Sequence, residues 1–222
     1  MIRVDLRLYA LLDPEHALGR DLAELAGLVA EGGATLVQLR DKRSHTGALV
    51  EHARAIKAAL APFRVPLLVN DRVDVALAAE AAGVHVGQTD MAAEDARRLL
   101  GPQAIVGLSL KTAAQAEAAP IDRIDYAGIG GVYSTTSKDN PDPPIGTSGL
   151  ARLAAILRRR VPGFPVCAIA GIEPANAADT IAAGADGIAV ISALARAHDP
   201  RAAARELRRI VDMALARRGA VG

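Results

Sequence analysis

Short apolar runs alternate with longer amphipathic stretches along the whole chain. The short runs are rich in valine, isoleucine and leucine, and they lie between turn-forming residues. Such runs are typical of strands that are buried on both faces of a parallel sheet. The pattern predicts strands over residues 7–12, 35–39, 66–69, 84–86, 105–108, 126–129, 166–169 and 187–190.

The stretches between these runs are rich in alanine and space their apolar residues along one face of a helix. Candidate start signals are Ser148, Pro174 and the pair Asp199-Pro200. Candidate stop signals are Gly32, Gly83, Gly101 and Gly184. The pattern predicts helices over residues 19–31, 46–61, 73–82, 92–100, 112–118, 148–160, 174–183 and 200–217.

The strict alternation of strands and helices predicts an α/β fold, a (β/α)8 or TIM barrel, as a single domain over residues 1–222. A doubly wound sheet is the alternative. We favour the barrel because no Gly-x-Gly-x-x-Gly turn follows the first strand, and because no residues remain for a second domain. The one long irregular stretch, residues 130–147, is predicted to be an active-site loop with Lys138 near its middle.

Composition and charge exclude several classes of protein. Hydrophobic residues make up 51% of the chain, as in globular proteins, whereas aromatic residues at 2% exclude proteins that stack bases on aromatic side chains. A net charge of +1 is too small to hold nucleic acid or an anionic membrane. The single cysteine, Cys167, excludes an intramolecular disulfide and a cysteine-based zinc site. Asp5 and Arg7 break the apolar run that a signal peptide needs, so we expect a cytoplasmic protein, with a homodimer left open.

The second predicted strand carries polar side chains toward the mouth of the barrel, where active sites of this fold lie. Side chains alternate along a strand, so Gln38, Arg40 and Lys42 share one face. Val37 and Leu39 then point toward the helices. A strand end with solvated charges is the alternative, but two cations beside a buried wall favour an anionic ligand.

Two carboxylates follow the third and fourth predicted strands. Asn70 and Asp71 end the third strand, and Asp90 comes shortly after the fourth. Mg²⁺ prefers one or two carboxylates together with water and phosphate oxygens, so the pair predicts a magnesium and polyphosphate site. Capping of the helices that follow is the alternative for each aspartate. Asp74 is expected on a helix surface.

The remaining strand ends offer a donor and a phosphate site. Ser109 ends the fifth strand as a candidate hydrogen-bond donor, with helix capping as the alternative. Gly171 follows the seventh strand, and Ile191 and Ser192 follow the eighth, where barrels of this type commonly bind phosphate. His85 is expected to be a packed barrel residue, as Cys167 is. Two anion sites on one barrel favour a transferase that joins two phosphorylated substrates.

The motifs at these positions resemble those of the thiamine phosphate synthase family, also called thiamine-phosphate pyrophosphorylases, from about Leu8 to Arg209. The motifs are QLRDK (38–42), ND (70–71), HVGQTD (85–90), GLS (107–109), TTSK (135–138), AGI (170–172) and VIS (190–192). Two departures stand out. The family loop commonly carries two prolines that residues 130–135 lack, and its usual Gly-Gly after the seventh strand is Ala170-Gly171 here.

The resemblance implies an Mg²⁺-dependent enzyme that couples 4-amino-2-methyl-5-hydroxymethylpyrimidine diphosphate to a thiazole phosphate and releases pyrophosphate. It implies binding of the pyrimidine diphosphate by Gln38, Leu39, Arg40, Asp41, Lys42, Asn70, Ser109 and Lys138. Of these, Arg40, Lys42, Ser109 and Lys138 would be catalytic. It implies binding of Mg²⁺ by Asp71 and Asp90, and of the thiazole phosphate by Thr135, Thr136, Ser137, Gly171, Ile191 and Ser192.

We expect dissociative cleavage of the C–O bond, because an aminopyrimidine stabilises the cation that pyrophosphate leaves behind. Three alternatives stay open. A related thiazole tautomerase would lack the diphosphate and metal residues. A sugar-phosphate isomerase or epimerase would use Asp71 and Asp90 as acid and base. A non-catalytic phosphate-sensing barrel would not need two anion sites.

Overall fold

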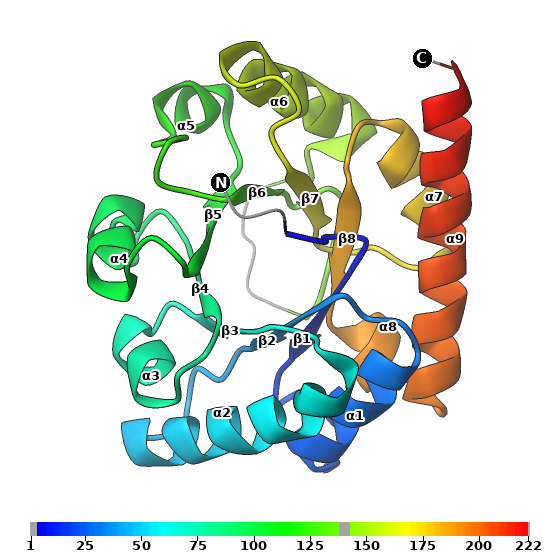
Figure 1. Cartoon of the computed structure of the whole chain (residues 1–222). Coiled ribbons are helices and arrows are strands. Elements are labelled where there is room, and N and C mark those ends of the chain that lie inside the picture. The colour runs from blue at the N-terminus through cyan, green and yellow to red at the C-terminus, as the bar shows by residue number, and fades with distance from the viewer. Residues whose placement is uncertain (1–3, 138–142, 222) are drawn as a thin grey trace.

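The computed structural model describes residues 4–137 and 143–221, and within them eight parallel strands close into a barrel (Figure 1). The strands are β1 (Leu8–Leu12), β2 (Leu36–Leu39), β3 (Leu67–Asn70), β4 (Gly83–Val86), β5 (Ile105–Leu110), β6 (Tyr126–Ile129), β7 (Val166–Ile169) and β8 (Gly187–Val190). Each strand pairs with the next, and β8 pairs with β1, with Tyr9 opposite Ala189. The predicted TIM barrel is confirmed, and the doubly wound alternative is wrong.

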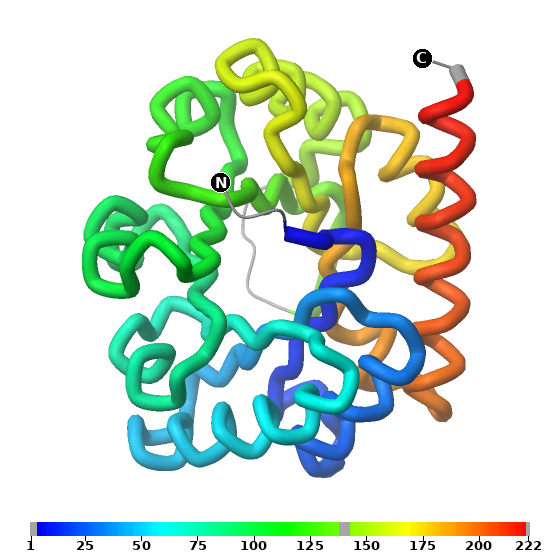
Figure 2. The backbone as a smooth tube through the Cα atoms, viewed as in Figure 1, coloured from blue at the N-terminus to red at the C-terminus, as the bar shows by residue number. Residues whose placement is uncertain are grey.

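Helices surround the barrel, as the tube in Figure 2 shows. They are α1 (Leu22–Glu31), α2 (Thr46–Leu60), α3 (Val73–Ala78), α4 (Ala93–Leu100), α5 (Ala113–Ala118), α6 (Gly146–Arg160), α7 (Pro174–Ala182), α8 (Ser192–Ala195) and α9 (Pro200–Val221), with a 3-10 turn η1 (Ala61–Phe63) after α2. The last helix, α9, packs against α7 and α1, so the end of the chain covers the seam where β8 meets β1. None of the described helices is long and apolar enough to cross a membrane.

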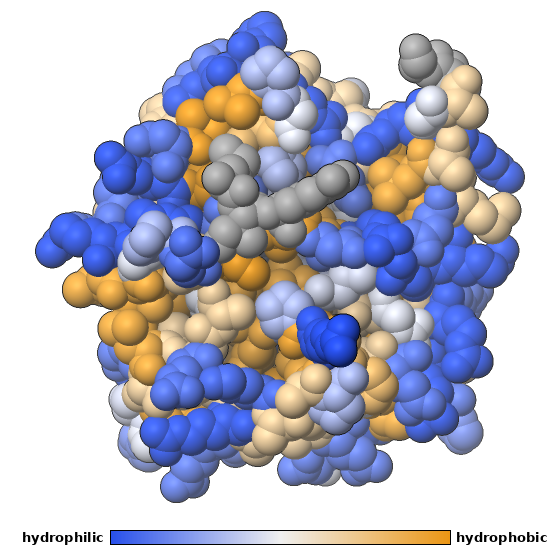
Figure 3. All heavy atoms as spheres, in the orientation of Figure 1, coloured by the Kyte–Doolittle hydropathy of each residue, from blue (hydrophilic) through white to orange (hydrophobic). Residues whose placement is uncertain are grey.

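The core has two layers because successive side chains of each strand point to opposite faces. The outer layer, between strands and helices, is aliphatic and includes Val37, Leu39, Val69 and Val84. The inner layer fills the barrel with Leu6, Tyr9, Leu36, Leu68, Ile105, Tyr126, Cys167 and Ala189. Hydrophilic residues lie mainly on the outer helices in the space-filling view, with apolar residues nearer the middle of that face (Figure 3).

Most predicted helix signals are where they were expected, and two are not. Pro174 starts α7, and the Asp199 carboxylate accepts a hydrogen bond from the Ala202 amide at 3.0 Å. Ser148 does not cap α6, because that helix already begins at Gly146. Gly83 does not end α3, which stops at Ala78. It begins β4 instead, where a Cβ would lie 1.8 Å from a carbonyl oxygen of the adjacent strand.

Candidate active site

A cavity of about 320 Å³ opens at the carboxyl ends of the strands. It is lined by ten of the predicted site residues: Gln38, Arg40, Asn70, Ser109, Thr135, Thr136, Ser137, Gly171, Ile191 and Ser192. The other predicted residues that the structure describes, which do not line it, are Leu39, Asp41, Lys42, Asp71 and Asp90. Lys138 lies outside the described residues, as do residues 139–142 of the predicted loop.

A chain of hydrogen-bonded side chains forms the floor of the cavity. The Gln38 amide donates to the Tyr9 hydroxyl, and the Tyr126 hydroxyl donates to the same oxygen at 3.1 Å. His85 contacts the Tyr126 hydroxyl through Nδ1 and the Ser109 hydroxyl through Nε2, both at 2.8 Å. Burial raises the pKa of both tyrosines, so their hydroxyls stay protonated. A satisfied polar network of this kind holds Ser109 in one orientation at the cavity wall.

Two residues of this network, His85 and Ser109, were singled out from the sequence. His85 is a packed barrel residue, as expected, and it contacts the predicted donor Ser109. Ser109 is inside β5, so it does not cap α5, whose first turn is capped by Thr112. Tyr9 and Tyr126 were missed. Their position along the strand could have identified them. Both tyrosines lie on the strand face that points into the barrel, as the polar side chains of β2 do.

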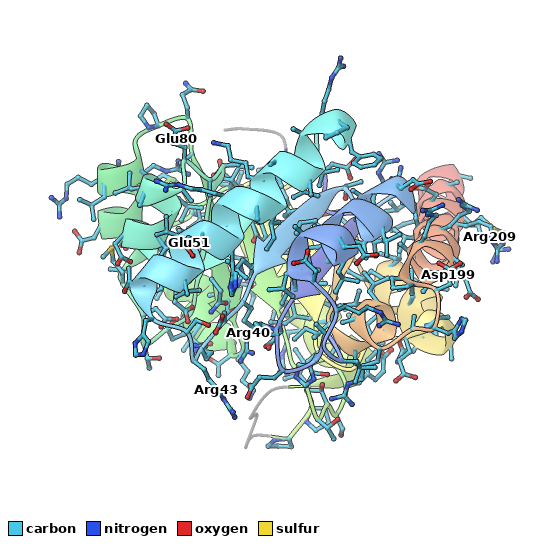
Figure 4. The ribbon with its side chains drawn as sticks, turned by 90° about the horizontal axis from the view of Figure 1, so that it is seen from below. Arg40, Arg43, Glu51, Glu80, Asp199 and Arg209 are labelled. Atoms are coloured by element: carbon cyan, nitrogen blue, oxygen red, sulfur yellow. The ribbon has the colours of Figure 1, made fainter. Side chains whose placement is uncertain are left out.

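Arg40 is fixed at the cavity mouth by an ion pair with Asp13. Asp13 follows β1 and is 1% exposed, so its carboxylate has little access to water and aims Arg40 into place. Arg40 and Arg43 lie at one end of the barrel and Glu80 at the other (Figure 4). Sequence reasoning missed Asp13, although it follows a strand as Asp41 and Asp71 do.

Lys42, Asn70 and Asp71 meet at the rim beside Asp90. The Asp71 Oδ2 oxygen accepts from Lys42 Nζ at 2.6 Å and from Asn70 Nδ2 at 2.7 Å. Burial raises the pKa of the Asp71 carboxyl, Lys42 opposes the rise, and the adjacent Asp90 carboxyl adds to it. The capping alternative is wrong for both aspartates, since α3 and α4 begin after Arg72 and Ala92, which make no side-chain cap.

Asp71 and Asp90 fit a hard cation. Within residues 4–137 and 143–221 no group of three or more His, Cys, Asp or Glu side chains is close enough to bind a metal by itself. Two carboxylates are nevertheless what Mg²⁺ takes from a protein when water and substrate oxygens complete its shell. One of them is half-buried, and the two repel each other when both are charged, so a divalent ion between them would stabilise the pair.

Residues with hydroxyl side chains, together with Gly171 and Glu173, line the other part of the cavity mouth. Residues 134–137 lie beside Gly171 and the start of α8, which Ile191 precedes. The two residues before this segment extend the sheet, because the amides of Val132 and Tyr133 donate to carbonyl groups at the end of β7. Gly171 has a φ of +68°, and a Cβ there would lie 2.4 Å from the Ser134 oxygen. Its glycine is therefore needed for the approach of this segment.

Leu39, Asp41 and Cys167 have structural positions. Leu39 is packed in the outer core layer, with its side chain facing the helices. Although burial works against it, hydrogen bonds from Ser44 and Arg43 lower the pKa of the Asp41 carboxyl, which closes the turn after β2. Burial raises the pKa of the fully buried Cys167 thiol, which makes it a core residue and no nucleophile.

Polar side chains and backbone amides at the carboxyl ends of a closed (β/α)8 barrel place the chain among the TIM-barrel enzymes. The family model described as thiamine monophosphate synthase matches residues 8–194. The chain belongs to this family and is a transferase of thiamine biosynthesis.

Relatives and a solved structure agree with this assignment. The chain is 50% identical to the thiamine-phosphate synthase of Agrobacterium fabrum over 97% of this chain and 98% of that protein. It is 47% identical to that of Xanthobacter autotrophicus over 93% and 96% of the two chains. The solved thiamine phosphate pyrophosphorylase of Pyrococcus furiosus is 35% identical and superposes with a TM-score of 0.83, over 96% of this chain and 98% of that one.

Proposed function

We propose that this chain condenses 4-amino-2-methyl-5-hydroxymethylpyrimidine diphosphate with 4-methyl-5-(2-phosphoethyl)-thiazole, or its carboxylated form, to give thiamine phosphate and pyrophosphate, with CO2 as a further product from the carboxylated form. One observation carries the proposal. Charged side chains gather on β2 to β4, with Arg40 at the cavity mouth and Lys42, Asp71 and Asp90 at the rim, whereas residues 134–137, Gly171 and the start of α8 line the cavity by β7 and β8. Two phosphorylated substrates require two such sites.

The charged part suits the diphosphate. Asp13 holds the Arg40 guanidinium at the mouth, where it can stabilise negative charge on the leaving oxygen without reorganising. Lys42 is half-exposed and shares the Asp71 carboxylate with Asn70, so it can turn toward a more highly charged ligand. The resemblance adds Lys138 to this group.

Mg²⁺ held by Asp71 and Asp90 would neutralise part of the diphosphate charge and so assist departure of pyrophosphate. The Asp71 carboxylate would bind it best when charged, a form that Lys42 and Asn70 stabilise by donating to its oxygen. Asp90 lies at the end of a tight turn, where its carboxylate accepts from the Gly87 amide at 2.8 Å. That hydrogen bond fixes the direction of the second carboxylate.

The chemistry needs no general base. The bond between the pyrimidine methylene carbon and the diphosphate oxygen breaks, and its electron pair leaves with pyrophosphate. The ring nitrogen of the thiazole then gives its lone pair to the methylene carbon, and with the uncarboxylated thiazole no proton moves. With the carboxylated form, CO2 also leaves and its ring carbon takes a proton from water. The floor of the cavity agrees with this scheme, because Tyr9 and Tyr126 stay protonated and Cys167 is buried away from the cavity.

Incubation of the purified chain with both substrates and Mg²⁺ tests the proposal. We expect stoichiometric thiamine phosphate and pyrophosphate, and no reaction in excess chelator. A thiazole tautomerase would rearrange the thiazole carboxylate alone and release no pyrophosphate. Turnover of a sugar phosphate without metal, or failure to form thiamine phosphate at any Mg²⁺ concentration, would overturn the proposal.

A further inference from the structure

The loop between β1 and α1, residues 13–21, contacts three of the segments that surround the cavity. Asp13 at its start holds Arg40. Arg20 near its end donates to the carbonyl oxygens of Ala195 and Ala197, at 2.6 and 2.8 Å, and so holds the end of α8. Between them lies His16, whose side chain is buried and which the mechanism above does not use.

Both ring nitrogens of His16 have partners from other elements. Nδ1 lies 2.7 Å from a guanidinium nitrogen of Arg196, the residue that ends α8. Nε2 lies 2.8 Å from the backbone oxygen of Ser137. A guanidinium group only donates, so Nδ1 must accept. The proton is therefore on Nε2, which donates to the Ser137 carbonyl, and the ring is neutral.

This contact orients the segment 134–137. Ser137 lines the cavity, but His16 is not among the described residues that do. The Ser137 carbonyl oxygen therefore points toward His16 and away from the cavity. A carbonyl oxygen that faced the cavity would repel a phosphate group. The Ser137 amide donates to the Thr135 hydroxyl at 3.1 Å, so the turn between these residues moves with that carbonyl.

We propose that His16 is a positioning residue for the phosphate of the second substrate. It links Arg196, which directly follows α8, to Ser137 and so sets the distance between residues 135–137 and the short helix α8. The identity of that substrate rests on the function proposed above. The link itself does not, because it consists of contacts within the protein.

Two substitutions separate the hydrogen bonds of His16 from its bulk. In His16→Leu both hydrogen bonds are lost, whereas in His16→Gln an amide can still donate to Ser137 and accept from Arg196. We expect His16→Leu to raise KM for the thiazole phosphate about tenfold, the loss of roughly one to two hydrogen bonds, and to change KM for the pyrimidine diphosphate less than twofold. His16→Gln should restore most of that affinity. His198→Leu, an exposed histidine after α8, is the matched control.

Hydrogen exchange of the Ser134–Ser137 amides in the unliganded protein gives a readout that needs no activity. Exchange should be faster in His16→Leu than in the wild-type chain and near wild-type in His16→Gln. Should His16→Leu not fold, Arg196→Met removes one of the two contacts and should show the same changes at smaller size. Equal KM values and exchange rates in all variants, or a glutamine variant as impaired as the leucine variant, would overturn the proposal. A wild-type chain that makes no thiamine phosphate would overturn the proposed function but leave the exchange result standing.

Discussion

Asp13 shows how a single buried carboxylate can prepare a binding group for its ligand. Arg40 has lost most of its access to water, with 16% of its side chain exposed, before any diphosphate arrives. The ion pair with Asp13 offsets that desolvation and also removes the freedom that a long side chain would otherwise lose on binding. Under the proposed function, the pair therefore serves affinity for the diphosphate more than stability of the fold.

Asp13→Asn keeps the shape of the side chain and removes its charge. We expect kcat/KM for the pyrimidine diphosphate to fall about 10- to 100-fold, the size of one charge-assisted hydrogen bond, and KM for the thiazole phosphate to stay unchanged. Steady-state kinetics with each substrate varied in turn checks this. A proportional rise in both KM values would mean that Asp13 supports the whole mouth rather than Arg40.

The two aspartates at the rim are expected to matter through the metal. Asp71→Asn and Asp90→Asn should each raise the Mg²⁺ concentration for half-maximal rate and lower turnover at least ~100-fold, the effect of losing a key electrostatic group. Asp74→Asn is the matched control, since that carboxylate is exposed and paired with Arg72. Magnesium titrations of the three variants measure this. Near-normal rates at low Mg²⁺ in both rim variants would argue against the metal site.

At the scale of elements, the contact of Gly171 with Tyr133 and Ser134 determines the shape of the cavity beside β7. Gly171→Ala would place a Cβ 2.4 Å from the Ser134 oxygen and 2.7 Å from Tyr133 Cβ, so the segment must move. We expect weaker thiazole phosphate binding together with a loss of stability of about 1–3 kcal/mol from the strained backbone.

Gly163→Ala provides the control for backbone strain. Gly163 has a φ of +74°, close to that of Gly171, but a Cβ there meets nothing within 4 Å. Both substitutions should lower the melting temperature, and only Gly171→Ala should weaken calorimetric binding of the thiazole phosphate. If Gly163→Ala weakened binding equally, the close approach at Gly171 would not be the cause.

The elements were predictable because strands of a parallel barrel are buried on both faces and leave an unbroken apolar pattern. Three strands, β6 to β8, have the predicted ends. Residues at strand ends identified seven of the ten cavity-lining residues that were predicted, and the family resemblance supplied the other three, Thr135, Thr136 and Ser137. Contacts between distant loops left no such pattern. Asp13 meets Arg40 across 27 positions and His16 meets Ser137 across 121, and neither pairing has a local signal. The role of Asp41 in closing a turn could not be predicted for a different reason. Aspartate is common both in turns that it closes by hydrogen bonds and in loops that bind ligands.

At the scale of the whole molecule, Cys167 reports on the integrity of the barrel. Its thiol is fully buried in the inner core layer and its pKa is raised by burial, so little thiolate forms at pH 8 and none is accessible. A disulfide reagent should therefore modify the native protein orders of magnitude more slowly than the denatured chain. The native rate should increase with denaturant in parallel with unfolding followed by circular dichroism. Rapid modification of the native protein would show that the barrel opens locally at β7.

Pairing of β8 with β1 has a consequence for synthesis on the ribosome. Side chains of the cavity come from Tyr9 near the start of the chain to Ser192 near its end. Until the last strand has left the exit tunnel, β1 lacks one of its two neighbours and the inner layer around Tyr9 stays open to water. Contacts between such distant positions slow folding, because a long loop must close before they form. The nascent chain is therefore expected to expose apolar strand edges for most of its translation, and to form the whole cavity in one late step.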